Sequence, residues 1–158
     1  MSLDDWILAL HLLTAFSLAA ALVGFWVLIL AARSAERPSG AAGFLRLSKP
    51  FAAAMGIGAA GTLIFGIWLA ISVDGYEVWD GWIIAAIVLW AVAGAVGGRA
   101  GREFETIGAR ARELAAAGDA PDAGLRTLPQ FPRAMGLHAV ATVAFIVILV
   151  LMIWKPGA

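Results

Sequence analysis

Two stretches of this chain correspond position by position: Phe51-Ala-Ala-Ala54-Met55-Gly56-Ile-Gly58-Ala59-Ala-Gly-Thr62-Leu-Ile-Phe65 and, eighty positions later, Phe131-Pro-Arg-Ala134-Met135-Gly136-Leu-His138-Ala139-Val-Ala-Thr142-Val-Ala-Phe145. Seven of the fifteen positions are identical. Composition alone would give about one or two matches in an alanine- and valine-rich membrane chain. Each stretch opens a long apolar segment. The repeat therefore predicts two parallel-topology helical hairpins, related by a pseudo-twofold axis along the membrane normal.

The composition places the chain in the membrane class, because 62% of its residues are apolar and 14% are charged, unlike soluble domains. Four stretches are long enough to cross roughly 30 Å of hydrocarbon at about 1.5 Å per residue. These predicted spans cover about residues 6–32, 51–72, 79–98 and 134–154, and no proline lies within them. We therefore predict an all-α, four-transmembrane-helix bundle that forms a single membrane domain over residues 1–158.

Several functions are disfavoured by what the sequence lacks. It has no cysteine, which excludes disulfides, thiolate nucleophiles and cysteine-ligated metals. Its basic residues are not interleaved with stacking aromatic residues, so no nucleic-acid partner is expected. Charged residues occur in the spans only near their ends, whereas proton pumps and ion-coupled carriers usually need intramembrane charges. An active carrier is therefore disfavoured.

The basic residues predict an orientation. Ten of the eleven Lys and Arg residues lie in, or border, the connections that follow the first and third spans. Because cytoplasmic loops are enriched in Lys and Arg, we expect these connections inside and both termini outside. The chain would then be a multi-pass protein of the bacterial inner membrane, with the lipid bilayer as its surroundings. A belt of aromatic residues at the outer level agrees with this orientation: Trp6, Trp68, Tyr76, Trp79, Trp82 and Trp154.

The connection from residue 99 to residue 133 is the longest polar segment. Within it, residues from about 102 to 117 are predicted to form an amphipathic helix, with Phe104, Ile107 and Leu114 near one face. Two interpretations remain for this helix. It is either a solvated or interfacial extension of the third span or a helix that binds a partner, and the extension is favoured.

Small residues and hydroxyls recur at helical spacing inside the spans, as at Gly58, Thr62 and Gly66. Such stripes let helix backbones approach closely. Helix packing is therefore favoured over a substrate path as the reason for them.

His11 and His138 are the side chains within the spans that could do chemistry near neutral pH. A four-helix membrane bundle is a common host for haem held by inward-facing histidines, so both are candidate haem ligands. His11 lies roughly 7.5 Å below Trp6 at the outer face, and His138 lies roughly 6 Å above Ala134 at the inner face. About 16 Å then separates them in a core of roughly 30 Å. We therefore expect two separate sites.

Each histidine also has simpler interpretations. It is either a hydrogen-bonded packing residue, which is favoured, or a single ligand to haem or a soft metal. His138 takes the place of Gly58 in the repeat, and Met55 and Met135 lie at a similar depth. A His/Met cofactor site near the cytoplasmic face is therefore compatible with the spacing, although methionines on helices are usually core residues.

The opening Asp5-Trp6-Ile-Leu-Ala-Leu-His11-Leu-Leu resembles the start of small bacterial predicted integral membrane proteins, with a tryptophan and then a histidine in the first helix. These are loosely similar to the membrane domain of copper resistance protein D and to the four-helix, haem-containing protoporphyrinogen oxidase. The resemblance covers the first span and the four-helix layout. In the oxidase family the histidine at the position of His11 is associated with haem, together with a lysine on a later helix. The later spans of this chain contain no lysine.

Three functions follow from these observations. The favoured one is a non-enzymatic membrane protein, acting as a structural subunit or small-ligand binder, with a second copy or another membrane protein as candidate partner. The second is a redox protein that binds haem b through His11 or His138. The third is the passage of copper or a small solute. No catalytic residue is identified, and no metal site is assigned.

Overall fold

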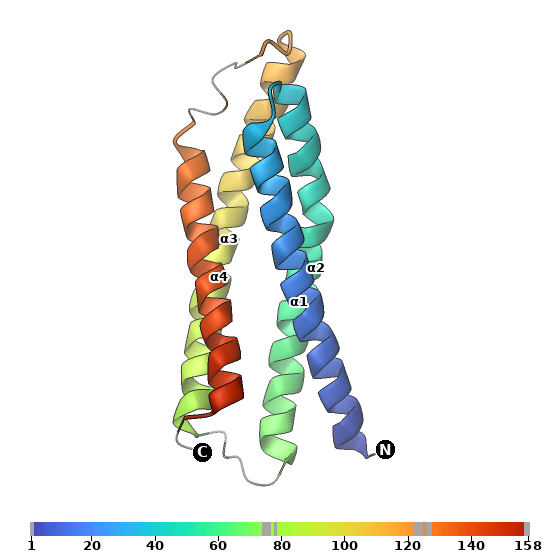
Figure 1. Ribbon diagram of the computed structural model, residues 1–158, viewed down its shortest axis with the longest axis vertical. Helices are drawn as coiled ribbons and strands as arrows, with labels where there is room; N and C mark the ends of the chain where they lie inside the picture. The colour runs from blue at the N-terminus through green and yellow to red at the C-terminus, as the bar shows by residue number, and fades with distance from the viewer. Residues whose placement is uncertain (1, 74–76, 78, 122–124, 126–127, 157–158) are drawn as a thin grey trace.

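The computed structural model describes residues 2–73, 77, 79–121, 125 and 128–156. These residues form four helices and no strand: α1 (Leu3–Ser34), α2 (Pro38–Ser72), α3 (Gly81–Ala116) and α4 (Gln130–Trp154). All four are long and apolar enough to cross a membrane. They run alternately up and down in an elongated bundle, with the two chain ends at the same end of it (Figure 1). The prediction of an all-helical protein with four spans is confirmed.

The first helix begins at Leu3 because Ser2 and Asp5 cap it. The Ser2 hydroxyl accepts a hydrogen bond from the Asp5 backbone N–H at 3.2 Å, and the Asp5 carboxylate accepts one from the Ser2 backbone N–H at 2.7 Å. This reciprocal capping box satisfies backbone donors that a helix start leaves unpaired. The acidic residues at the chain start therefore have a local structural role.

The second helix is longer than the predicted span, because it starts at Pro38 and continues through Pro50. Proline is favoured in the first turn of a helix, which suits Pro38, but inside a helix it removes one backbone hydrogen bond. Ala41, Leu45 and Ser48 are buried on the preceding turns. Tertiary packing of this segment offsets the hydrogen bond that is lost at Pro50. The predicted span is shorter because hydropathy along the sequence does not include this packing.

The third helix continues without a break through the residues for which the sequence predicts an amphipathic loop helix. Its last turns bury Phe104, Ile107 and Ala111. The helix ends at Ala116, and Gly118 beyond the cap residue has a φ of +123°, so that the Asp119 backbone N–H donates to the Leu114 carbonyl at 3.2 Å. This is the Schellman arrangement, which favours glycine at the first position after the helix.

Asp119 then joins the ends of the two hairpins. Its carboxylate accepts hydrogen bonds from the backbone N–H of Ser39 at 2.8 Å and from the Ser39 hydroxyl at 2.6 Å. Arg37, at the start of α2, makes no side-chain cap of its own, and it donates to the Asp119 carbonyl at 3.1 Å. The side-chain and backbone hydrogen bonds from Ser39 hold the pKa of Asp119 below its ordinary value. Asp119 therefore caps α2 from a distant part of the chain.

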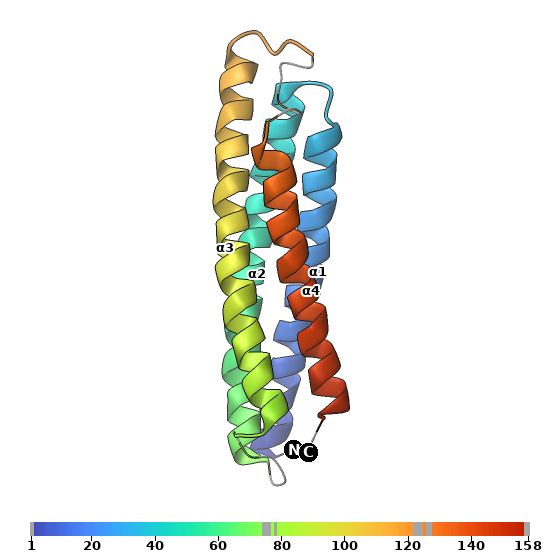
Figure 2. The same cartoon turned by 90° about the vertical axis from the view of Figure 1, so that its left-hand side faces the viewer.

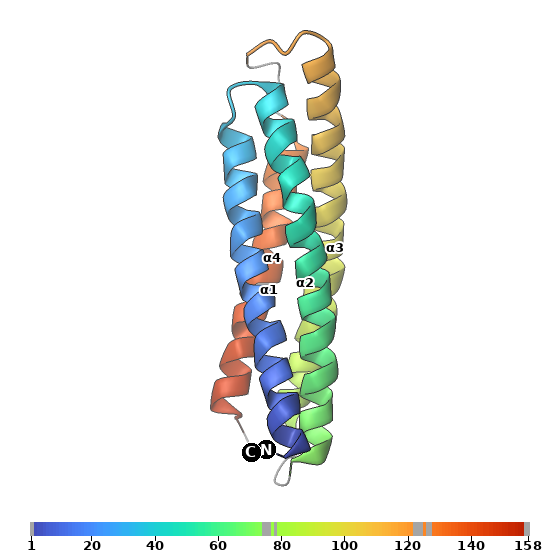
Figure 3. The ribbon, with the colours of Figure 1, turned by 90° about the vertical axis from the view of Figure 1, so that its right-hand side faces the viewer.

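A cluster of buried apolar residues lies in the half of the bundle that carries the α1–α2 and α3–α4 connections. It combines residues of all four helices, including Phe25, Ile29, Leu45, Phe104, Ile107 and Phe131. Towards the opposite end, which carries the chain termini, α4 diverges from α1 (Figures 1 and 3). In Figure 2 the bundle is turned so that the hairpin of α3 and α4 lies in front of the hairpin of α1 and α2. The hairpins thus meet in one half of the molecule and separate in the other.

The structure leaves the internal repeat as a prediction. Both hairpins run in the same direction (Figure 1). Thr62 donates to the Thr14 hydroxyl of α1, its own hairpin partner, at 3.2 Å, whereas Thr142 accepts from the Trp26 indole of α1, in the other hairpin, at 3.0 Å. Exchanging the two hairpins does not interconvert these two contacts.

Candidate functional site

The first candidate site is built on a close approach of α1 and α2. A Cβ added at Gly58 would lie 3.0 Å from the Leu18 backbone nitrogen and 3.0 Å from the Thr14 carbonyl oxygen. A Cβ at Gly61 would lie 2.5 Å from the Thr14 methyl carbon. These distances leave no room for a side chain, so α2 presents its glycines to α1. Packing therefore accounts for the small-residue stripe of α2.

His11 lies on the same seam, against Gly66. A Cβ at Gly66 would be 3.0 Å from the His11 Cε1 and 3.3 Å from its Nδ1. The Nδ1 atom also lies 3.0 Å from the backbone carbonyl oxygen of Thr62. The Nδ1–Cε1 edge of the imidazole is thus held against α2. Because the two ring nitrogens point in divergent directions, Nε2 points away from the Thr62 carbonyl.

The partner of Nδ1 determines where the ring carries its proton. A carbonyl oxygen can only accept a hydrogen bond, so Nδ1 is the N–H donor and Nε2 of the neutral ring holds a lone pair. Thr62 uses its own hydroxyl elsewhere, since it donates to Thr14, and the Thr14 hydroxyl donates to the carbonyls of Leu10 and His11 at 2.9 Å each. His11 therefore presents an acceptor nitrogen.

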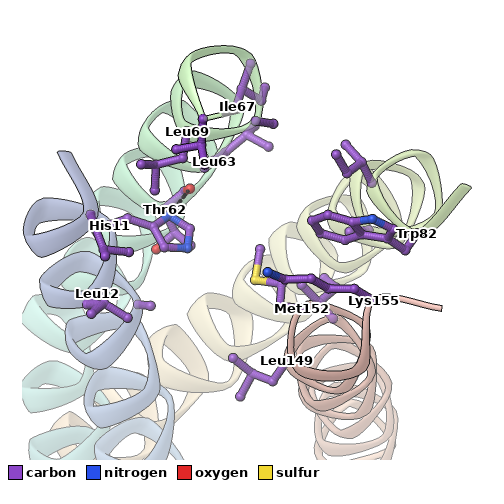
Figure 4. Close-up of a pocket in the computed structure, with 18 of the residues that line it drawn as sticks. His11, Leu12, Thr62, Leu63, Ile67, Leu69, Trp82, Leu149, Met152 and Lys155 are labelled. Carbon is purple, nitrogen blue, oxygen red and sulfur yellow. Dashed lines mark hydrogen bonds between the residues drawn. The ribbon is translucent and has the colours of Figure 1, made fainter. Parts of the chain in front are cut away.

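The imidazole lines a cavity of about 610 Å³ between the diverging hairpins. All four helices contribute to it, and Figure 4 shows His11 beside Thr62 on one side, with Trp82, Met152 and Lys155 across from them. Most of the lining is apolar, whereas Asp4, Asp5 and Lys155 lie at the end that carries the termini. Ligand pockets typically occupy about 300–1,000 Å³ and combine apolar walls with a few polar groups. The cavity fits that description.

His138 occupies a different environment. It is 4% exposed, and its ring lies 4.9 Å from that of Phe25, 4.8 Å from that of Trp26 and 6.4 Å from that of Phe104, measured between centroids. In the part of the chain that the structure describes, its Nε2 is buried without a hydrogen-bond partner. His138 is thus enclosed by aromatic rings and does not line the cavity.

The structure keeps the two histidines apart. The His138 ring touches Phe25 and Trp26 of α1, which follow His11 by fourteen and fifteen positions. At about 1.5 Å per residue this is roughly 20 Å along the helix. Two imidazoles this far apart could not both hold one haem iron.

The two methionines lie at the edge of the buried cluster. Met55 and Met135 both pack against it, and the Met135 sulfur accepts a long hydrogen bond of 3.5 Å from the Arg33 guanidinium. Within the described residues, no group of three or more His, Asp and Glu side chains is arranged to hold a metal ion. The methionines therefore have packing contacts that account for their position.

Several lining residues were not identified as site residues from the sequence. The sequence predicts Trp82 in the aromatic belt and Gly66 in a packing stripe, and it gives no indication of a site at Trp90 or Met152, yet all four line the cavity. Spacing along one helix shows which residues share a face, but it does not show which faces of four helices meet around a space. The glycine opposite His11 was the signal that could have led to the site.

Comparison with known proteins identifies one family. The family described as "Predicted integral membrane protein (DUF2269)" matches residues 5–156, nearly the full length of the chain. No curated protein and no solved structure matches the chain. The expected resemblance to predicted integral membrane proteins is thereby confirmed. Similarity to copper resistance protein D or to protoporphyrinogen oxidase is not shown.

Proposed function

Because the chain belongs to the family of predicted integral membrane proteins (DUF2269), we propose that it acts within the bilayer, as a non-enzymatic protein that binds a small apolar molecule. The binding site is the cavity between the hairpins. The observation that carries this proposal is the His11 imidazole, which is oriented by the Thr62 carbonyl at 3.0 Å and lines a mostly apolar space of about 610 Å³. Apolar walls supply affinity, and the single oriented imidazole supplies orientation.

The composition of the cavity favours binding over catalysis. General acid–base or nucleophilic catalysis needs two or three functional groups within hydrogen-bond reach of one another. Here the imidazole bonds to a backbone carbonyl, and the neighbouring threonine hydroxyls bond to each other and to helix carbonyls. These groups are paired in ways that support the position of the ring.

We further propose that the chain lies in the bacterial inner membrane with both termini outside. The basis is the division of the Lys and Arg residues, ten of which lie in or beside the two connections at the opposite end. The cavity would then be in the outer half of the bilayer. A ligand would reach it from the outer leaflet or from the outer aqueous face.

A pair of alanine variants on α2 tests the proposed cavity. Ala70 lines it, whereas Ala60 is exposed on the same helix and outside the lining. Ala70→Phe should fill the space, and Ala60→Phe should place the same ring in lipid. Organic extracts of the purified proteins are compared by mass spectrometry. We expect a compound that accompanies wild type and Ala60→Phe but is depleted in Ala70→Phe, and identical extracts from all three would contradict the proposal.

A second candidate function is haem binding through His11, as haem b. The specific observation is that His11 donates Nδ1–H to a backbone carbonyl, since metal-bound histidines usually donate their other ring N–H in this way. Bound haem would supply electron transfer, and His11 would hold it through Nε2. A Soret band in the purified protein that is lost in His11→Ala and retained in His138→Ala is the expected result. A colourless protein after expression with added haem precursor would rule this out.

A further inference from the structure

The hydrogen bond that His11 makes through one ring nitrogen determines what its other ring nitrogen can do in the cavity. His11 Nδ1–H donates to the Thr62 carbonyl, so the Nε2 lone pair is left pointing away from that carbonyl. The threonine protons are not offered to the cavity, because Thr62 donates to Thr14 and Thr14 donates to helix carbonyls. A ligand group that lies against this side of the cavity would therefore have to donate a hydrogen bond to His11 Nε2.

We propose that the ligand is an uncharged aromatic alcohol of the phenol class, whose hydroxyl donates to His11 Nε2. This inference rests on the proposed binding function and specifies its ligand. A ketone, ether or ester brings only acceptors, so its oxygen would face the Nε2 lone pair without a proton between them. Moving the ring proton to Nε2 would not help, because Nδ1 would then face the Thr62 carbonyl without one.

The other walls indicate an aromatic and uncharged body. Trp82 and Trp90 line the cavity together with leucines, isoleucines and Met152, which suit a flat apolar ring system. The charged residues at the terminal end have both signs, Asp4 and Asp5 against Lys155. They select neither a cation nor an anion, and a charged group deeper in an apolar cavity would lose its hydration.

Gly66 determines the position of the acceptor. Because a Cβ there would lie 3.0 Å from Cε1 and 3.3 Å from Nδ1, the imidazole has to move if residue 66 carries a side chain. Gly66→Ala should therefore shift the imidazole, and the only chemical change that it makes to the cavity lining is one added methyl group. Gly56 is the matched control on the same helix, since a Cβ at that position meets nothing within 4 Å.

The test compares two ligands that share a body and differ in the donor, 2-naphthol and 2-methoxynaphthalene. Binding to the full-length protein in lipid nanodiscs is measured by titration calorimetry, with empty nanodiscs as the blank. We expect wild type and Gly56→Ala to bind 2-naphthol about tenfold more tightly than its methyl ether, the factor for one well-formed hydrogen bond. The preference should fall to about onefold in His11→Leu, which has no acceptor, and it should be reduced in Gly66→Ala, where the imidazole has to shift. His11→Gln, whose amide oxygen can accept, should retain part of it.

Three outcomes would overturn the inference, and they separate it from the proposed function. In the first outcome, 2-naphthol and 2-methoxynaphthalene bind equally tightly, and Ala70→Phe weakens the binding of both. This result would support binding in the cavity but contradict the requirement for a hydrogen-bond donor. Binding that Ala70→Phe does not affect would place the ligands outside the cavity and contradict both. Absence of binding by 2-naphthol would reject the phenol class, while the extracts of the alanine variants still decide on the cavity. Thermal unfolding of each variant shows whether it is folded.

Discussion

At the scale of single residues, the two histidines differ in what their nitrogens contact. His11 donates to a carbonyl at 3.0 Å and lines a cavity, whereas the Nε2 of His138 is buried among aromatic rings without a partner in the described part of the chain. A buried polar atom that makes no hydrogen bond lowers the free energy of unfolding, whereas a buried hydrogen bond that is formed raises it. The same side chain should therefore affect stability in opposite directions at the two positions.

Replacing each histidine by phenylalanine tests this. His138→Phe keeps a ring beside Phe25 and Trp26 and removes the unpaired nitrogen, so the free energy of unfolding should stay unchanged or rise by about 1 kcal/mol. His11→Phe loses the hydrogen bond to Thr62 and should lower the free energy of unfolding by about 1 kcal/mol. Both are measured by thermal unfolding in one detergent. A marked loss of stability in His138→Phe would mean that this imidazole has a partner in the native membrane.

At the scale of the helices, contact between α1 and α2 depends on glycines at the seam. A Cβ at Gly58 would meet backbone atoms of Leu18 and Thr14 at 3.0 Å, and backbone atoms cannot move aside as a flexible side chain can. The two helices would have to separate. Because His11 is held by the Thr62 carbonyl on the same seam, this separation would also loosen the imidazole.

A pair of glycine variants on α2 isolates this contact. Gly58→Ala should lower the free energy of unfolding by about 1–3 kcal/mol, as overpacking does. Gly56→Ala meets no neighbour, and alanine is the better helix former by about 0.8–1 kcal/mol, so this control should be neutral or stabilising. Chemical or thermal unfolding followed by circular dichroism gives both values. Equal effects at positions 56 and 58 would show that the seam is not closely packed.

At the scale of the whole molecule, the two hairpins are joined at one end and apart at the other. The buried cluster and the Asp119–Ser39 contacts connect them where the two connections lie. The cavity separates them towards the termini. Which end faces the cytoplasm decides from which side of the membrane the proposed ligand would enter the cavity.

Single cysteines test this orientation, and the chain has no cysteine of its own to add background. Glu36 and Glu77 are both exposed, Glu36 after α1 and Glu77 before α3. In intact cells, an impermeant maleimide should label Glu77→Cys at once and Glu36→Cys only after permeabilisation. The expectation follows from the ten basic residues at the end that carries Glu36. Labelling in the reverse order would place both termini inside.

The number and class of helices could be predicted from the sequence because hydropathy acts segment by segment. The apolar stretch of α4 alone is long enough to span a bilayer whatever its neighbours do. Helix lengths were less predictable. Residues 38–50 are helical because Ala41 and Leu45 are buried by other helices, and that burial outweighs the proline at position 50.

The candidate site was predictable only in part. The ordinary pKa of histidine, which lies near neutral pH, singled out His11 and His138 from the sequence, because that reference value depends on residue type alone. Their different roles depend on the rotation and tilt of each helix about its neighbours. Only the tertiary structure brings the Thr62 carbonyl and the bare Cα of Gly66 to His11, encloses His138 in aromatic rings and opens a space beside Trp82 and Trp90. These contacts join residues far apart in the chain, and no local pattern specifies how four apolar helices turn towards one another.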